Sequence, residues 1–220
     1  MQPALIVFDL DGTLIDSAAD LAAAANRMLA GFGCEPLPVP EVRRMIGDGV
    51  AMLVARALAA RRCEHADPAE AAQIFMRHYE SDATSLTTTF PGADDALQAL
   101  QATGIPLAVC TNKPARITAD ILSSLGLARY FARVIGGDSL PFRKPDPRVL
   151  LTLLEAFSAR PEGSLLVGDS EVDAATARSA GVPFVLMKHG YRRGPAQEIP
   201  CTAALESFGE LPALVRALAG

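Results

Sequence analysis

The sequence has few lysines and no block of basic residues. Only three of its 20 basic residues are lysines, and the arginines are scattered along a chain with a net charge of −5 and a pI of about 5.2. Proteins that bind nucleic acids need clustered cationic side chains to neutralise the phosphates. We therefore expect no nucleic-acid partner.

Long hydrophobic runs and a secretion signal are also missing. The N-terminus has no positively charged region and reaches Asp9 too soon for a signal peptide. No apolar run approaches the roughly 20 residues that a membrane-spanning helix requires. We expect a cytoplasmic protein without a membrane partner.

Cysteines are few and far apart. The four are Cys34, Cys63, Cys110 and Cys201, and no two of them form a C-x-x-C pair. Free thiols in the core of a protein from a reducing compartment explain this spacing better than a disulfide frame or a zinc site.

Short apolar runs alternate with longer amphipathic stretches over most of the chain. The apolar runs predict buried parallel strands over residues 4–8, 106–110, 134–135, 164–167 and 183–187. The amphipathic stretches predict helices over residues 93–103, 115–125, 147–157 and 172–180. The alternation predicts an α/β fold with a Rossmann-like, doubly wound parallel sheet.

One interval, from residue 17 to residue 87, interrupts this alternation. It contains helical patterns over residues 18–30, 50–60 and 69–81, separated by glycines and prolines, and no convincing strand. We therefore expect an all-helical cap domain over residues 17–87, inserted into a core of residues 1–16 and 88–220 whose sheet resumes at Phe90.

Four aspartates lie where two of the predicted strands end. Asp9 and Asp11 are two residues apart on an extended segment, so their side chains point the same way. Asp169 and Asp173 are four apart at a helix start and share a face. Because ligands of a parallel sheet bind at the carboxyl ends of its strands, we expect the four carboxylates to crowd one cleft. Mg²⁺ would compensate their charge while keeping waters and a substrate phosphate.

Donors suited to a phosphate group occur near the same strand ends. Lys144 adds a positive charge, and Thr111, Asn112 and nearby backbone N–H groups add neutral donors. Gly12 permits a close approach of the backbone. One carboxylate of the first loop can attack phosphorus, and the second can protonate the departing alkoxide and later take a proton from water. The residues thus predict metal-assisted phosphoryl transfer.

Four segments follow one another in the order of the four motifs of the haloacid dehalogenase superfamily. They are Asp9-Leu10-Asp11-Gly12-Thr13-Leu14, Thr111-Asn112, Lys144-Pro145 and Gly168-Asp169 with Asp173. The chain resembles this superfamily over most of its length, and its helical insertion lies at the position of the superfamily's first cap type.

The resemblance implies a role for each matching residue. Asp9 would be the nucleophile and a metal ligand, and Asp11 would be the acid/base and bind the metal through its carbonyl. The remaining positions would serve phosphate (Gly12, Thr111, Asn112, Lys144) or metal (Asp169, with Asp173 ligating it or ordering its waters).

Within the superfamily the sequence looks most like bacterial phosphoglycolate phosphatases. The stretches that carry this likeness include Phe8–Ser17, Ile46-Gly47-Asp48-Gly49, Phe90-Pro91-Gly92, Thr111-Asn112-Lys113-Pro114 and Ile135-Gly136-Gly137-Asp138. The likeness implies a Mg²⁺-dependent phosphomonoesterase that acts on 2-phosphoglycolate. We expect a monomer or a homodimer.

Several alternatives stay open. The substrate can be another small metabolite (a sugar phosphate, a nucleotide or pyrophosphate), the enzyme can be a phosphomutase, and a non-catalytic binding module is a remote third possibility. Two other chemistries of the superfamily do not fit. A phosphonate hydrolase needs a lysine in its cap, and no lysine precedes Lys113, which excludes it. A dehalogenase needs neither a general acid nor a metal set, so Asp11 and Asp169 argue against it.

Other residues admit both a structural and a functional interpretation. Asp169 and Ser170 can cap the following helix, and Thr111-Asn112 can be an ordinary turn. In the insertion, three arginines can bind a substrate carboxylate or be surface charges (Arg43, Arg44, Arg56). Three histidines lack ligand spacing and are expected to be structural or exposed (His65, His78, His189).

Overall fold

Six parallel strands form the central sheet of the computed structural model, which describes residues 3–219. In sheet order the strands are β5 (Arg133–Ile135), β4 (Leu107–Cys110), β1 (Leu5–Phe8), β6 (Ser164–Gly168), β7 (Phe184–Met187) and β8 (Ala203–Leu205). Every residue of β1, β4, β6 and β7 is buried, as their continuous apolar character predicts. Terminal residues 1, 2 and 220 of the predicted core lie outside the described residues.

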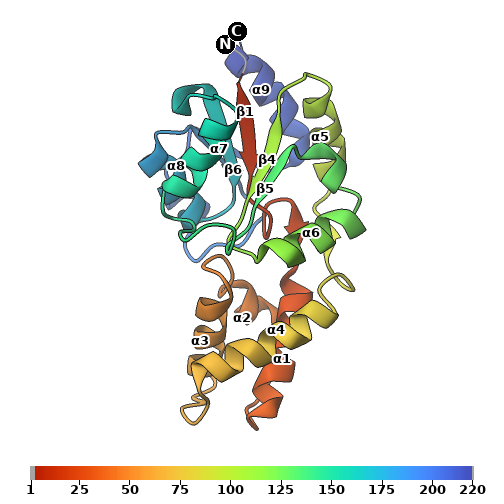
Figure 1. Cartoon of the computed structure of the whole chain (residues 1–220), viewed down its shortest axis with the longest axis vertical. Helices are drawn as coiled ribbons and strands as arrows, with labels where there is room; N and C mark the ends of the chain where they lie inside the picture. Colours follow the sequence, from red (N-terminus) through yellow and green to blue (C-terminus); the bar gives the residue numbers. More distant parts are fainter. Residues whose placement is uncertain (1–2, 220) are drawn as a thin grey trace.

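Helices cover both faces of this sheet (Figure 1). Alternate residues of β1 point to opposite faces: Leu5 and Val7 pack in a core with α7 (Arg148–Ala156) and α8 (Glu171–Ala180). Ile6 and Phe8 belong to the core of the other face, which is covered by α5 (Ala93–Gln101), α6 (Ala115–Ser124) and α9 (Leu211–Ala219). The predicted doubly wound fold is confirmed.

Four further helices lie together at the carboxyl ends of the strands (Figure 1). They are α1 (Ala18–Gly31), α2 (Val39–Arg43), α3 (Val50–Ala60) and α4 (Pro68–Ser81). Helix α4 starts where the sequence signals it, because the Asp67 carboxylate accepts the N–H groups of Ala69 and Glu70 and Pro68 occupies the first turn. Two short antiparallel strands, β2 (Ile15–Asp16) and β3 (Thr88–Thr89), carry the chain into and out of these helices.

The structure differs from the predicted element list at several places. The main sheet resumes only at β4, since residues 90–92 form a turn before α5. The strands β2, β3 and β8 and the helices α2 and α9 are not among the predicted elements. Strands of two or three residues are too short to show a period. Four single turns of 3-10 helix complete the fold (Ala128–Tyr130, Pro161–Gly163, Ala196–Glu198, Phe208–Glu210).

The expectation of four free core thiols is wrong. A disulfide joins Cys34, which follows α1, to Cys63, which follows α3, with 6.4 Å between their Cα atoms. The packing of the helices brings together two residues that are 29 positions apart, which spacing alone does not reveal. Cys110 is a buried free thiol, whereas Cys201 is exposed.

Within residues 3–219, no helix is both long and apolar enough to cross a membrane.

Candidate active site

Three aspartates converge where the two central strands end. Asp9 follows β1 and Asp169 follows β6, and these strands pair side by side, with Phe8 opposite Val167. Asp173 lies in the first turn of α8. All three residues are buried, and one carboxylate oxygen from each lies within 4.8 Å of the others. Carboxylates from distant parts of the chain thus meet at one point, as the strand ends predict.

The Asp169 carboxylate is held from both sides. One oxygen accepts the Thr13 hydroxyl at 2.7 Å, and the other accepts the backbone N–H of Tyr191. Gly12, with a φ of +87°, packs directly against it, because a Cβ at this position would lie 2.5 Å from the Asp169 oxygen. The close approach expected at Gly12 is therefore an approach to Asp169 and to the Tyr191 ring. Gly190 packs as tightly on the same carboxylate and had not been singled out from the sequence.

Asp173 both caps the helix α8 and contacts the lysine of the site. One of its oxygens accepts the Ser170 hydroxyl at 2.6 Å and the N–H groups of Ser170 and Asp169, in a capping box that starts α8. Its other oxygen accepts a hydrogen bond from Lys144 at 2.6 Å. Asp173 thus anchors both the helix and the lysine of the cluster.

Lys144 lies between two of the aspartates. Its ammonium is 2.7 Å from Asp9 and 2.6 Å from Asp173, and its side chain is only 2% exposed. Burial opposes the charge of Lys144, but the carboxylates of Asp173 and Asp9 outweigh that effect and raise its pKa. The lysine therefore stays charged beside the nucleophile candidate.

One lysine does not balance three buried carboxylates. Burial raises the pKa of Asp9 to about 7, with Lys144 lowering it and Asp173 raising it further. The pKa of Asp169 is also raised, by burial and by the charges of Asp173 and Asp9. Such a cluster has oxygen ligands for a hard cation and an excess of negative charge that a cation would offset.

Asp11 is engaged elsewhere in the site. Its carboxylate accepts two hydrogen bonds from Lys113, at 2.8 and 3.0 Å, and one from the Ser17 hydroxyl. The expected convergence of four carboxylates therefore holds for three of them. Lys113 has a side chain that is 2% exposed, and its ammonium lies 4.7 Å from the ring centre of Tyr79 on α4.

No role was predicted for Lys113 or Tyr79 from the sequence. Lys113 directly follows Thr111 and Asn112, so its place beside the second motif is a usable signal. Tyr79 carries no such signal, because an aromatic residue on the buried face of an amphipathic helix is usually a core residue.

Thr111 and Asn112 follow β4 and are both buried. The Asn112 amide donates to the carbonyl of Lys144 and to that of Gly47, each at 2.9 Å. Gly47 belongs to the loop before α3, so Asn112 connects the strand ends with the helical insertion. The loop Gly47-Asp48-Gly49 thus reaches the site.

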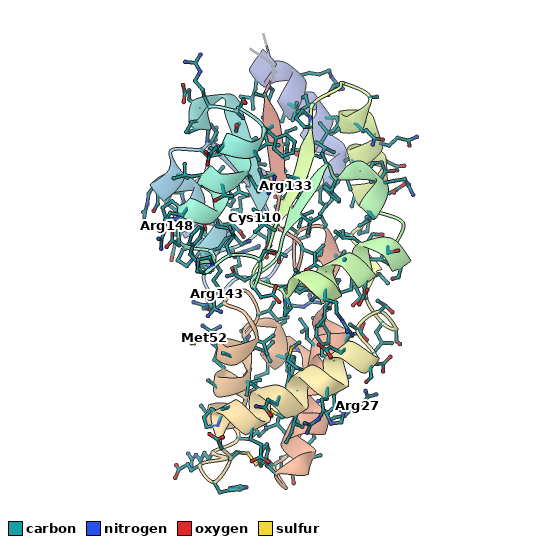
Figure 2. All side chains as sticks on the ribbon, viewed as in Figure 1. Arg27, Met52, Cys110, Arg133, Arg143 and Arg148 are labelled. Carbon is teal, nitrogen blue, oxygen red and sulfur yellow. A yellow bond between two sulfur atoms is a disulfide. The ribbon has the colours of Figure 1, made fainter. Side chains whose placement is uncertain are left out.

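A cavity of about 40 Å³ lies between the strand ends and the helices. Its wall on the sheet side contains five polar residues (Asp9, Asp11, Thr111, Asn112, Lys113), and its wall on the helix side is mainly apolar (Leu21, Ile46, Val50, Leu53, Tyr79). Arg143 lies at the same junction of sheet and helices (Figure 2). A Cβ atom added to Gly49 would lie 3.8 Å from the guanidinium carbon of Arg143.

The arginines of the insertion are used differently. Arg43 pairs with Asp16 at 2.7 Å and lies over the Tyr191 ring, and Arg56 pairs with Asp48. Arg44 is exposed, and none of the three is among the described residues that line the cavity. His65 and His189 bond backbone carbonyls of Phe32 and Thr13, in agreement with a structural role, and His78 is half-buried.

Comparison with known proteins identifies the family. The family model for haloacid dehalogenase-like hydrolases matches residues 6–187. The chain belongs to this family. A phosphoglycolate phosphatase of Cereibacter sphaeroides (strain ATCC 17025 / ATH 2.4.3) is 47% identical over 216 residues, which cover 97% of this chain and 98% of the relative. Phosphoglycolate phosphatase 1 of Pseudomonas aeruginosa is 43% identical and covers 95% of this chain and 78% of the relative.

Solved structures agree with this membership. The crystal structure of a predicted phosphoglycolate phosphatase from Haemophilus somnus 129PT superposes with a TM-score of 0.92 at 31% identity, over 97% of this chain and 98% of that one. This haloacid dehalogenase-like hydrolase is therefore an enzyme, a phosphoric monoester hydrolase that acts on a small phosphorylated substrate.

Proposed function

We propose that the enzyme hydrolyses 2-phosphoglycolate, with Mg²⁺, through a phosphorylated Asp9. The observation that carries the substrate assignment is that relatives 43–47% identical over nearly the whole chain are named phosphoglycolate phosphatases. The small cavity, whose polar wall includes Asp9 and Asp11, supports a compact phosphorylated substrate.

The donor set fits Mg²⁺, since it offers three buried carboxylates and, among the described residues, Lys144 is the cation paired with them. Asp9 and Asp169 would hold the ion through their carboxylates and Asp11 through its carbonyl. Asp173, whose oxygens bond Lys144 and the N-terminus of α8, would support this site by positioning these groups or by ordering the waters of the ion. When bound, Mg²⁺ would neutralise charge on the transferring phosphoryl group.

The protein groups perform the chemistry in two steps. Asp9 attacks phosphorus, the bond from phosphorus to the ester oxygen breaks, and the departing oxygen takes a proton from Asp11. A water molecule then attacks the phosphorus of the aspartyl phosphate while Asp11 takes its proton, which releases phosphate and restores Asp9.

The phosphoryl group is held by nearby donors during both steps. Lys144, which is 2.7 Å from Asp9, would stabilise its negative charge. The Thr111 hydroxyl and the backbone N–H groups around Asn112 and Gly12 would donate to its remaining oxygens.

Residues 17–87 act as a cap on a core of residues 1–16 and 88–220. The cavity wall is supplied by both parts, and the paired strands β2 and β3 form the connection between them. Because both parts line the cavity, movement of the cap away from the strand ends would admit the substrate, and closure would exclude water from the reacting phosphoryl group.

A substrate panel tests the proposal. Phosphate release from 2-phosphoglycolate in Mg²⁺ is compared with release from sugar phosphates, nucleotides and pyrophosphate, and the highest kcat/KM is expected for 2-phosphoglycolate. A strong preference for another compound would refute the substrate and leave the mechanism standing. Formation of an isomer from a sugar phosphate, in place of free phosphate, would indicate a phosphomutase.

A further inference from the structure

Two buried polar groups of the cavity wall have no part in this mechanism. The Lys113 ammonium lies over the Tyr79 ring, and both residues line the cavity. Tyr79 is only 1% exposed, and its hydroxyl, which interacts with the Lys113 ammonium, donates its proton to no acceptor in the part of the chain that the structure describes. A buried hydroxyl proton without an acceptor costs free energy, so an acceptor from outside the protein is to be expected.

The two groups are both donors. Burial raises the pKa of Tyr79 to about 12, so that its hydroxyl keeps its proton at neutral pH. The Lys113 ammonium has three N–H bonds, and the two contacts to Asp11 use them only in part. A cationic donor beside a neutral donor matches the two oxygens of a carboxylate.

The position of Lys113 relative to the chemistry shows which part of a substrate it would meet. Lys144 contacts Asp9, where the phosphoryl group is transferred, whereas Lys113 contacts Asp11, which protonates the leaving oxygen. Lys113 therefore lies on the side of the leaving group. In 2-phosphoglycolate a single methylene separates the leaving oxygen from the carboxylate.

We infer that Lys113 and Tyr79 form an anion subsite that binds the carboxylate of the leaving group. The subsite selects phosphorylated carboxylic acids over phosphate esters of the same size whose leaving group carries no charge. This inference rests on the proposed function for the identity of the leaving group. The surrounding wall of Leu21, Ile46 and Leu53 has no polar side chain to bind a larger polar group.

Binding of two phosphonates tests the subsite without depending on turnover. 3-Phosphonopropionate has the shape and charges of 2-phosphoglycolate, with a methylene in place of the ester oxygen, and propylphosphonate lacks its carboxylate. Calorimetry in Mg²⁺ should give tighter binding of 3-phosphonopropionate to the wild type. Lys113→Met should reduce this preference about 10- to 100-fold, and Tyr79→Phe about 3- to 10-fold, as expected for a charged and a neutral hydrogen bond.

A matched control separates this effect from a general loss of lysine charge. Lys188→Met removes a lysine that pairs with the exposed Glu206, outside the cavity, and should leave the preference unchanged. If Lys113→Met lowers the affinity for both phosphonates by the same factor, Lys113 only positions Asp11, and the inference is overturned. If Lys113→Met does not fold, Tyr79→Phe decides, since it keeps the ring, and an unchanged preference would overturn the subsite.

The outcomes also separate this inference from the proposed function. If the enzyme prefers 3-phosphonopropionate through Lys113 but does not hydrolyse 2-phosphoglycolate, the substrate assignment is refuted and the subsite is supported. If it hydrolyses 2-phosphoglycolate but shows no preference between the phosphonates, the substrate assignment is supported and the subsite is refuted.

Discussion

The Lys144 ammonium lies 2.7 Å from the Asp9 carboxylate, and the same ammonium donates to Asp173 at 2.6 Å. The lysine connects a residue that follows the first strand with one in the helix after β6, inside a buried cluster. It therefore has two functions to test, one in stability and one in binding the phosphoryl group.

The stability of the fold should depend strongly on Lys144. Lys144→Met leaves two buried carboxylates without their cation, so the free energy of unfolding should fall by about 3–5 kcal/mol in denaturant titrations. Lys188→Met breaks the exposed pair with Glu206 and should change it by no more than about 1 kcal/mol. Similar losses in both variants would contradict the role of Lys144 in the cluster.

Removal of the proposed nucleophile should abolish turnover and spare the fold. Asp9→Asn keeps the size of the side chain and cannot form an aspartyl phosphate, so phosphate release should fall to background while the thermal midpoint is kept. Asp11→Asn should lower kcat by about 10²–10⁴-fold, the usual contribution of a general acid/base. Wild-type turnover by Asp9→Asn would favour a different mechanism altogether.

Magnesium should stabilise the enzyme through Asp169. A ligand that binds only the folded state raises its stability by mass action, so Mg²⁺ should raise the melting temperature of the wild type and EDTA should reverse the effect. Asp169→Asn should lose this response. Glu171→Gln, two residues later in the first turn of α8 and outside the carboxylate cluster, is the matched control and should keep it.

Gly12 should tolerate no side chain. A Cβ there would lie 2.5 Å from the Asp169 oxygen and 2.9 Å from the Tyr191 ring, so Gly12→Ala should displace Asp169 and weaken the response to Mg²⁺. Gly33→Ala has a similar left-handed φ of +69° and nothing within 4 Å, so it should cost only about 1–2 kcal/mol of backbone strain. An equal loss in both variants would indicate that strain alone, and not contact with Asp169, requires the glycine.

The amino-acid sequence was sufficient for the features that depend on local pattern. Continuous apolar runs such as Leu5–Phe8 predict buried parallel strands, and the polar residues that follow them predict a site at one edge of the sheet. The convergence of Asp9 and Asp169 follows from this topology, because their strands are neighbours in the sheet. Roles in catalysis remain predictions for the experiments above.

Tertiary structure decided which side chains meet across elements. The period of a helix predicts that Tyr79 is buried, but only packing brings its ring to Lys113, and only the folded chain pairs Lys113 with Asp11, 102 positions away. The disulfide between Cys34 and Cys63 was missed for the same reason. A periodic pattern determines which face of an element is covered, whereas the partner on that face depends on how the other elements pack against it.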